Sequence, residues 1–314
     1  ETAMRIVFMG TPEFAVPSLE ACVETGNEVA LVVTQPARAR GRGQRIVASP
    51  IRQRAEALGL PVLETEKVNQ EQDLARLRET DPDLVCVAAF GQLLSADVLA
   101  VPSGGCVNVH GSLLPRWRGA APIHHALMAG DAVTGVTTMS MVQKMDAGDV
   151  LLQRSTPIGP SETQGDLSRR LARMGGELLA ETLGLLERGA APRTAQDPAA
   201  VTFAPLLKKE DGRVDWTQPA ERIRNLVRGT IPWPGAFCFT DGGRLRLWET
   251  RTASVPSAAE GEPGEVVEIR TDAIVVASGE GLIVLTEVQP ENKRRMPAAD
   301  WSRGARIRCG DVLH

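Results

Sequence analysis

The sequence RIVFM at residues 5–9 is typical of a buried strand, and GTP at residues 10–12 ends it. Similar runs return at residues 28–34, 61–63, 83–88 and 105–109, and helical patterns lie between most of them. Buried strands that alternate with helices predict a parallel sheet with helices on both faces. We therefore expect a Rossmann-like, mostly parallel α/β fold with right-handed crossover connections.

Further elements extend this first domain. Ser49 and Pro50 fit the N-cap and the first position of a helix that runs through residue 58. Two more strand-like runs occupy residues 135–141 and 150–158, and an apolar helical period predicts one long helix over residues 163–188. We expect residues 4–188 to form one domain.

The rest of the chain has a different character. Residues 189–204 show no sustained period and are expected to be a linker. One helix follows, and then short strand-like pieces separated by glycine turns, at residues 236–239, 244–248, 264–270, 273–277 and 282–288. This pattern predicts a small antiparallel, OB-like β-barrel over residues 205–314.

Composition narrows the class of protein. The 314 residues are 43% hydrophobic and 24% charged with a net charge of -4, which argues against a disordered chain. We see neither a membrane-spanning run nor a secretory signal, so we expect a cytoplasmic protein. The five cysteines form no CxxC pair, which favours reduced thiols and no metal site.

The most informative segment for chemistry is NVHGSLLPRWRG at residues 108–119, at the end of an expected parallel strand. Ligands of open α/β sheets bind at that edge. Alternation along the strand places Asn108 and His110 on the same side. The amide can donate to an oxyanion and the imidazole can move a proton. A turn-stabilising asparagine beside a surface histidine fits the same residues equally well.

Asp146 stands on a short connection between two expected strands, in the sequence DAGD. An acid beside glycine often only caps a turn. Close to His110, its carboxylate would instead orient the ring and favour the imidazolium.

Two segments together resemble the signature of the folate-dependent formyltransferase family. The first is Asn108-x-His110 with the following SLLP and Gly119, and the second is DAGD at residues 146–149. Within the family, GTPEF at residues 10–14, HGSLLPRWRGAAP at residues 110–122 and KKEDG at residues 208–212 resemble the members that formylate methionine on initiator tRNA. The resemblance runs from about residue 4 to the end of the chain.

The resemblance implies a reaction and its site. A formyl group would pass from 10-formyltetrahydrofolate to the α-amino group of methionyl initiator tRNA, without a metal. Asn108 and protonated His110 would stabilise the tetrahedral oxyanion, and Asp146 would orient His110 and help remove the amine proton. The implied folate contacts are Phe90, Gly91, Gln92, Leu93, Ser112, Leu113, Leu114 and Pro115.

Basic residues gather in two places. Four arginines within eight residues, Arg38, Arg40, Arg42 and Arg45, form a glycine-rich stretch expected to be a mobile loop. Such a loop is either a solvated surface or a phosphate contact. The resemblance implies contact with the tRNA acceptor stem, with Arg42 as the best single candidate. A second basic cluster, Lys293, Arg294 and Arg295, is either a tRNA-backbone surface or a solvated rim of the barrel. Lys208 is a further candidate tRNA contact.

Three alternatives stay open at this point. Another folate formyltransferase could act on a nucleotide or a sugar amine, and a formyltetrahydrofolate hydrolase would share the same three polar residues. A noncatalytic RNA-binding protein could keep the α/β scaffold. The C-terminal residues 205–314 contain 16 basic and 16 acidic residues, so a tRNA surface there requires one-sided placement of charge. We expect a monomer.

Overall fold

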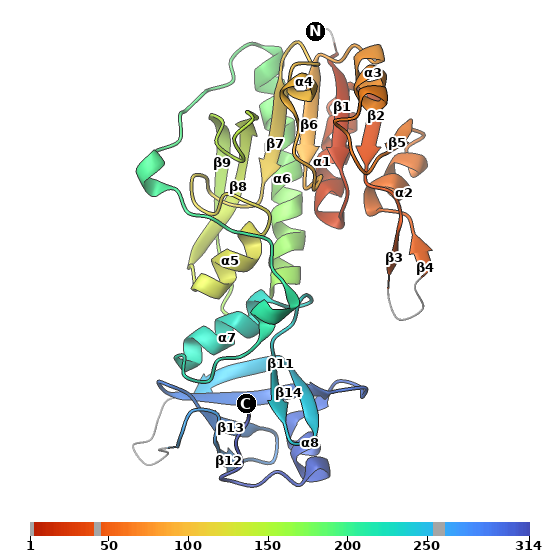
Figure 1. Ribbon diagram of the computed structural model, residues 1–314. Coiled ribbons are helices and arrows are strands. Elements are labelled where there is room, and N and C mark those ends of the chain that lie inside the picture. The colour runs from red at the N-terminus through yellow and green to blue at the C-terminus, as the bar shows by residue number, and fades with distance from the viewer. Residues whose placement is uncertain (1–2, 41–44, 254–260) are drawn as a thin grey trace. The chain divides into compact units, whose positions relative to one another are not determined.

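The computed structural model describes residues 3–40, 45–253 and 261–314 (Figure 1). The chain groups into two compact units. The first unit comprises Glu1–Pro122, Val133–Pro157 and Ser168–Pro205, and the second comprises Ile123–Ala132, Ile158–Leu167 and Leu206–His314. The second unit thus takes two short segments that precede its main part in the sequence.

A seven-stranded sheet forms the first unit, in the order β5-β2-β1-β6-β7-β8-β9. Its strands are β1 (Arg5–Gly10), β2 (Glu28–Thr34), β5 (Val62–Glu64), β6 (Leu84–Ala88), β7 (Cys106–His110), β8 (Val133–Ser140) and β9 (Val150–Pro157). The strands from β5 to β7 are parallel, while β8 runs antiparallel to both β7 and β9. The prediction of a mostly parallel sheet is confirmed.

Helices cover both faces of this sheet, because alternate side chains of each strand point to opposite faces. Ile6 and Phe8 share a buried cluster with residues of three helices, α1 (Val16–Glu24), α2 (Pro50–Ala57) and α6 (Gln164–Glu187). Val7 and Met9 share the opposite cluster with residues of α3 (Glu71–Glu79) and α4 (Ala96–Leu99). A 3-10 turn, Glu13–Ala15, leads into α1.

The arginine-rich stretch differs from the expected loop. Its two arms, β3 (Arg38–Arg40) and β4 (Arg45–Val47), pair antiparallel, with Arg40 opposite Arg45. Backbone hydrogen bonds hold such a pair whatever the period of its side chains, so the missing apolar pattern gave no sign of it. Arg42, the best single tRNA candidate, lies outside the described residues.

The segment predicted as a linker makes ordered contacts within the first unit. Thr194 pairs with Val150 by two backbone hydrogen bonds, and Phe203 forms a parallel bridge with Arg118. A short 3-10 turn, Pro198–Ala200, lies between these two points. The segment is therefore extended along the first unit before the chain enters the second.

The second unit is an antiparallel sheet with helices. Its sheet order is β10-β11-β14-β13-β12, and β15 pairs with β14. The elements are α5 (Pro122–Ala129), a 3-10 turn (Lys209–Gly212), α7 (Ala220–Gly229), β10 (Phe237–Thr240), β11 (Gly243–Ala253), β12 (Val266–Ile269), β13 (Ile274–Ala277), β14 (Leu282–Pro290), β15 (Met296–Pro297) and α8 (Ala298–Ala305).

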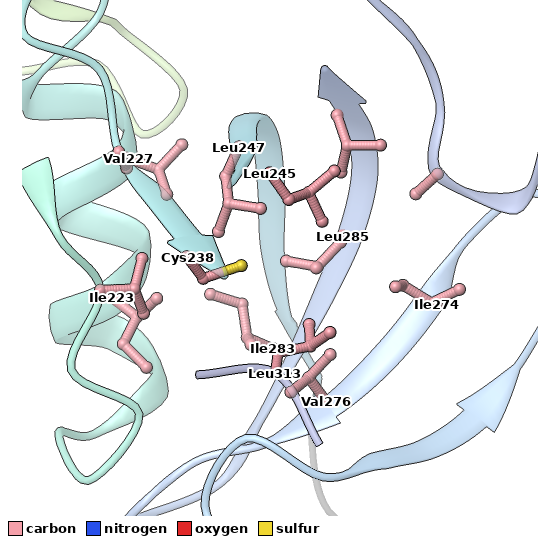
Figure 2. Packing of buried hydrophobic residues seen from close by; sticks show 14 of the residues in the cluster. Ile223, Val227, Cys238, Leu245, Leu247, Ile274, Val276, Ile283, Leu285 and Leu313 are labelled. Atoms are coloured by element: carbon pink, nitrogen blue, oxygen red, sulfur yellow. The ribbon is translucent and has the colours of Figure 1, made fainter. Parts of the chain in front are cut away.

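The sheet curls around one apolar core (Figure 2). Ile223 and Val227 of α7 pack there against Leu245 and Leu247 of β11. The last residues of the chain connect the two ends of the sheet. The backbone of His314 exchanges two hydrogen bonds with the backbone of Phe239 in β10, and the backbone of residues 310–313 bonds to Gly264 and Val266 at β12. The predicted antiparallel, OB-like barrel is confirmed.

The cysteines are free thiols in the described part of the chain. Cys22, Cys86, Cys106 and Cys238 are buried, in agreement with the prediction of reduced thiols. Burial raises the pKa of Cys106 and of Cys238 to about 12, so these thiols stay protonated near neutral pH. Cys309 is exposed.

Candidate active site

Strand β7 brings two polar side chains to one face of the sheet. Val107 and Val109 belong to the cluster with α1 and α6, so alternation places Asn108 and His110 on the opposite face. Both residues are buried, with 9% and 5% of their surface exposed. The expected arrangement of the pair on one side of the strand is therefore present.

His110 faces an acceptor at each ring nitrogen. Its Nε2 lies 2.9 Å from the Trp117 carbonyl oxygen, which can only accept, so Nε2 carries a proton. Its Nδ1 lies 3.8 Å from Oδ2 of Asp146. That distance is too long for a hydrogen bond but close enough for attraction to an imidazolium. The ring is thus placed between a backbone carbonyl oxygen and a carboxylate.

The Asn108 side chain makes no hydrogen bond to any other described residue. The residue keeps 9% of its surface exposed and its amide atoms are not fully enclosed, so water can satisfy them until a ligand takes its place. The side chain therefore has a donor to offer to a bound ligand.

Asp146 lies on the connection between β8 and β9, where the sequence predicted it. Its Oδ2 accepts a hydrogen bond of 2.8 Å from the backbone nitrogen of Gly119. Gly119 has φ +123°, and a Cβ there would lie 2.6 Å from the Ala204 carbonyl oxygen, so no larger residue fits. The carboxylate thus joins the loop after β7 to the connection before β9.

Left-handed backbone occurs in the loops at this site. Ala89, Trp117 and Asp146 have φ values of +45°, +61° and +50°. This region is disfavoured for residues other than glycine, by about 1–3 kcal/mol each. Such conformations persist where neighbouring contacts impose them, and they gather at functional sites.

The first group of folate candidates follows β6. Phe90 is buried and accepts hydrogen bonds at its carbonyl from Thr11 and Gln35, and Gly91 is left-handed with φ +82°. The Gln92 side chain bonds to backbone groups of Thr65 and Val68.

Apolar side chains of this region reach the surface. Leu93 is 65% exposed, and on the connection that carries Asp146, Val142 and Met145 are exposed as well. Phe90 belongs to the same apolar cluster as Met141, which begins that connection. Val142 and Met145 were not predicted, because exposure of a single apolar residue leaves no sequence pattern.

The second group of folate candidates follows β7. The Ser112 hydroxyl donates to the Arg116 carbonyl, and the Leu114 backbone bonds to Thr137 and Gln153. Ser112 and Leu114 are buried, whereas Leu113 and Pro115 are partly exposed. The polar groups of the two buried residues thus hold the shape of the loop.

The tRNA candidates lie in both units. Arg38, Arg40 and Arg45 belong to β3 and β4. Lys208, Lys293 and Arg294 are exposed in the second unit. Arg295 is also exposed, forms an ion pair with Glu287 and stacks over Trp248 at 4.9 Å.

Two residues that the sequence analysis did not single out connect the loops of the site. Arg118 is 6% exposed and donates two hydrogen bonds to the side-chain oxygen of Gln196. The Gln196 amide in turn donates to the backbone carbonyls of Asp146 and Gly148. Arg118 lies in the stretch of residues 108–119 that the sequence analysis quoted, but Gln196 lies in no motif, so no signal in the sequence identifies their pairing.

Comparison with known proteins defines the class. A formyl transferase family model matches residues 4–183, and a model of the formyl transferase C-terminal domain matches residues 206–306. The first match alone spans more than half of the chain, and the second spans most of the remainder. The chain therefore belongs to the formyl transferase family.

The relatives specify the member of the family. The methionyl-tRNA formyltransferases of Citrifermentans bemidjiense and Moorella thermoacetica are each 47% identical to this chain, over 99% of its length. The alignments cover 97% and 99% of those two proteins. The chain thus matches methionyl-tRNA formyltransferase from end to end, which confirms the resemblance predicted from its motifs.

Solved structures share the fold at lower identity. HypX from Aquifex aeolicus in complex with tetrahydrofolic acid is 21% identical, with a TM-score of 0.64 over 96% of this chain and 47% of HypX. WlaRD, a sugar 3N-formyl transferase, is 13% identical, with a TM-score of 0.68 over 94% of this chain and 100% of its own. At these identities the likeness establishes the fold.

The described residues offer neither a metal site nor a membrane span. No group of three or more His, Cys, Asp or Glu residues there could hold a metal ion. No helix in the described part of the chain has the length and apolar character to cross a bilayer.

Proposed function

We propose that this chain transfers the formyl group of 10-formyltetrahydrofolate to the α-amino group of methionine on initiator tRNA. The observation that carries the chemistry is the side-chain amide of Asn108. It lies on the same face of β7 as His110 and has no hydrogen-bond partner among the described residues. A preorganised donor stabilises an oxygen that becomes negative in the transition state. The name of the relatives supports the choice of substrate.

The first step is attack of the neutral amine on the formyl carbon. A carbon–nitrogen bond forms, and the carbonyl electron pair moves to the oxygen. The Asn108 amide and the His110 ring donate hydrogen bonds to that oxyanion. Because Nε2 of His110 already donates to Trp117, the proton at Nδ1 is the one that serves the oxyanion.

Asp146 serves the proton transfers. Its carboxylate keeps the His110 ring oriented and accepts the amine proton, directly or through a water molecule. The bond from carbon to the folate nitrogen then breaks, and that nitrogen takes a proton from His110 or water. The amine attacks directly, so no covalent enzyme intermediate forms.

The folate lies against the segments after β6 and β7. Phe90, Gly91, Gln92 and Leu93 form one wall, and the loop of residues 112–115 forms the other. Support comes from the exposed apolar surface of Leu93, together with the apolar cluster shared by Phe90 and Met141. Ser112 and Leu114 act by shaping their loop.

The tRNA contacts the arginine-rich stretch of residues 38–45 and the second unit. We assign residues 4–188 to catalysis and residues 205–314 to tRNA binding, joined by residues 189–204. Support comes from the outer face of β10 and β11, where Arg244 stacks over Phe237 and Arg246 stacks over Trp248. Arginine guanidinium groups held in this way on one face of a sheet suit contacts with phosphates.

The test is transfer of labelled formyl from 10-formyltetrahydrofolate to purified methionyl initiator tRNA. Methionyl elongator tRNA and uncharged initiator tRNA serve as controls. We expect label on the charged initiator tRNA alone. Release of free formate, or label on a small amine, would keep the chemistry and overturn the proposed acceptor.

A further inference from the structure

The segment of residues 194–204 lies against both loops of the candidate active site. The Arg118 backbone nitrogen donates to the Thr202 carbonyl at 2.9 Å, and the Ala204 nitrogen donates to the Arg118 carbonyl at 2.7 Å. The Thr202 hydroxyl accepts from the Trp117 nitrogen at 2.8 Å. The carbonyl that binds His110 therefore belongs to a residue held by this segment.

Gln196 makes the most extensive side-chain contacts of the segment. Its Nε2 donates to the carbonyls of Asp146 and Gly148, both at 2.8 Å. Its Oε1 accepts from Nε and Nη2 of Arg118, at 3.0 and 2.8 Å. All hydrogen-bonding positions of the amide are thus used. The Arg118 bonds are charge-assisted and are stronger than those between neutral groups.

The backbone of residues 146–148, to which Gln196 bonds, has an unusual and crowded conformation. Asp146 is left-handed, and a Cβ at Gly148 would lie 1.7 Å from the Ser140 carbonyl oxygen. A turn of this kind needs outside contacts to persist. Gln196 supplies them at both ends of the turn and connects them to Arg118, which precedes Gly119, the donor to Asp146.

We propose that Gln196 is a positioning residue for formyl transfer, which holds residues 146–148 so that the Asp146 carboxylate stays beside His110 and Gly119. The inference rests on the proposed role of Asp146. Gln196 touches no reacting atom and acts through the carbonyl groups on either side of Ala147. Arg118 fixes the orientation of its amide.

Two variants distinguish the hydrogen bonds that the Gln196 amide donates from those that it accepts. Gln196→Met keeps the length of the side chain and removes all four hydrogen bonds. Gln196→Glu keeps an acceptor for Arg118 but removes both donors to residues 146 and 148. We expect each variant to lower kcat by about 10- to 100-fold, the size of effect that small misplacements of catalytic groups produce. The KM values for folate and tRNA should stay unchanged.

The matched control is Asp197→Ala. Asp197 is the next residue, and its side chain caps the turn by accepting from the Ala199 nitrogen at 2.9 Å, but it makes no hydrogen bond to residues 146–148. We expect wild-type turnover from it. Loss of turnover in Asp197→Ala equal to that in Gln196→Met would show a general disturbance of the segment and would overturn the proposal.

A double-mutant cycle with Asp146→Asn distinguishes positioning from general support of the fold. If Gln196 acts through Asp146, adding Gln196→Met to Asp146→Asn should lower kcat far less than it does in the wild type. Full, additive losses would overturn the proposal, as would unchanged kcat in Gln196→Glu. Thermal unfolding of each variant identifies any that fail to fold, and Gln196→Glu then replaces Gln196→Met.

The test of Gln196 does not depend on which molecule accepts the formyl group. If the wild-type chain released formate instead of labelling tRNA, the proposed function would fail. The same variants would then be compared in formate release, where the cycle applies unchanged.

Discussion

The Asn108 amide is buried at the end of β7 without a partner among the described residues, which makes it the sharpest residue for testing the chemistry. Asn108→Ala removes one donor to the oxyanion, and we expect kcat to fall by about 100- to 1,000-fold. The KM for tRNA should change little, because the amide acts on the transition state. Single-turnover formylation with saturating tRNA measures this loss.

Near-normal turnover in Asn108→Ala would remove Asn108 from the mechanism. The comparison variant is Asn108→Asp, which keeps the shape but places an acceptor where a donor is needed. It should be at least as slow as Asn108→Ala, because a carboxylate would repel the oxyanion.

His124 should make the free energy of unfolding depend on pH. Burial lowers its pKa to about 4, helped by the charge of neighbouring His125 and opposed by a hydrogen bond to the Trp233 backbone. The unfolded chain takes up this proton near pH 6.5 and the folded chain does not. The stability is therefore complete above pH 6.5 and falls as the pH drops toward 4, by on the order of 3 kcal/mol at most.

Urea unfolding between pH 4.5 and 7 checks this. His124→Gln should flatten the pH dependence of the unfolding free energy, while His314→Gln, which removes an exposed histidine, should leave it unchanged. Equal slopes in the wild type and His124→Gln would show that the histidine does not set the dependence.

At the scale of elements, local signals predicted most of the fold. Ser49 caps α2 as expected, with its hydroxyl accepting from the Arg52 nitrogen at 3.0 Å. The helix α8 was missed, because its eight residues include Gly304 and follow Pro297, which reads as a turn. Its buried face is Trp301 with small residues, so only packing in the second unit reveals it.

Some residues of the candidate site could likewise be predicted from the sequence, and others could not. Asn108 and His110 could be paired from strand alternation, since that period belongs to the sequence itself. Gln196 could not be found, because it bonds to backbone carbonyls that every residue carries. Hydrogen bonds of this kind, fifty residues apart in the chain, have no spacing rule.

Arg42 is the best single candidate for a contact with the tRNA. Arg42→Ala should weaken use of tRNA and reduce the slope of log affinity against log salt by about 0.7 to 0.9, the effect of one lost phosphate contact. The control is Arg76→Ala, because Arg76 is an exposed arginine of α3 paired with Glu79. An unchanged slope in Arg42→Ala would mean that this residue makes no phosphate contact.

At the scale of the whole molecule, net charge says little about the partner. The chain carries a charge of -4 although its proposed substrate is a polyanion. Within the second unit, however, Arg213, Arg244 and Arg246 stack on the aromatic rings of β10 and β11. Local placement of cations, rather than their sum, decides where a nucleic acid can bind.

The second unit is built from three separate segments of the chain, and this predicts where a stable fragment can begin. Residues 123–132 and 158–167 belong to it, and they contact α7: Arg228 donates to the Gly159 carbonyl at 3.2 Å, and a Cβ at Gly229 would lie 2.8 Å from Met128. A fragment of residues 205–314 lacks both segments. We expect it to be less stable than the same region in the full chain, because one side of α7 loses its packing.

Hydrogen exchange of the β11 and β14 amides compares the two forms directly. These strands are held by the core that α7 covers, through Ile223 and Val227 (Figure 2). Faster exchange in the fragment is the expected result, since local opening follows the loss of buried contacts. Equal protection would instead show that residue 205 begins an independently stable domain, and that the two earlier segments rest on it without supporting it.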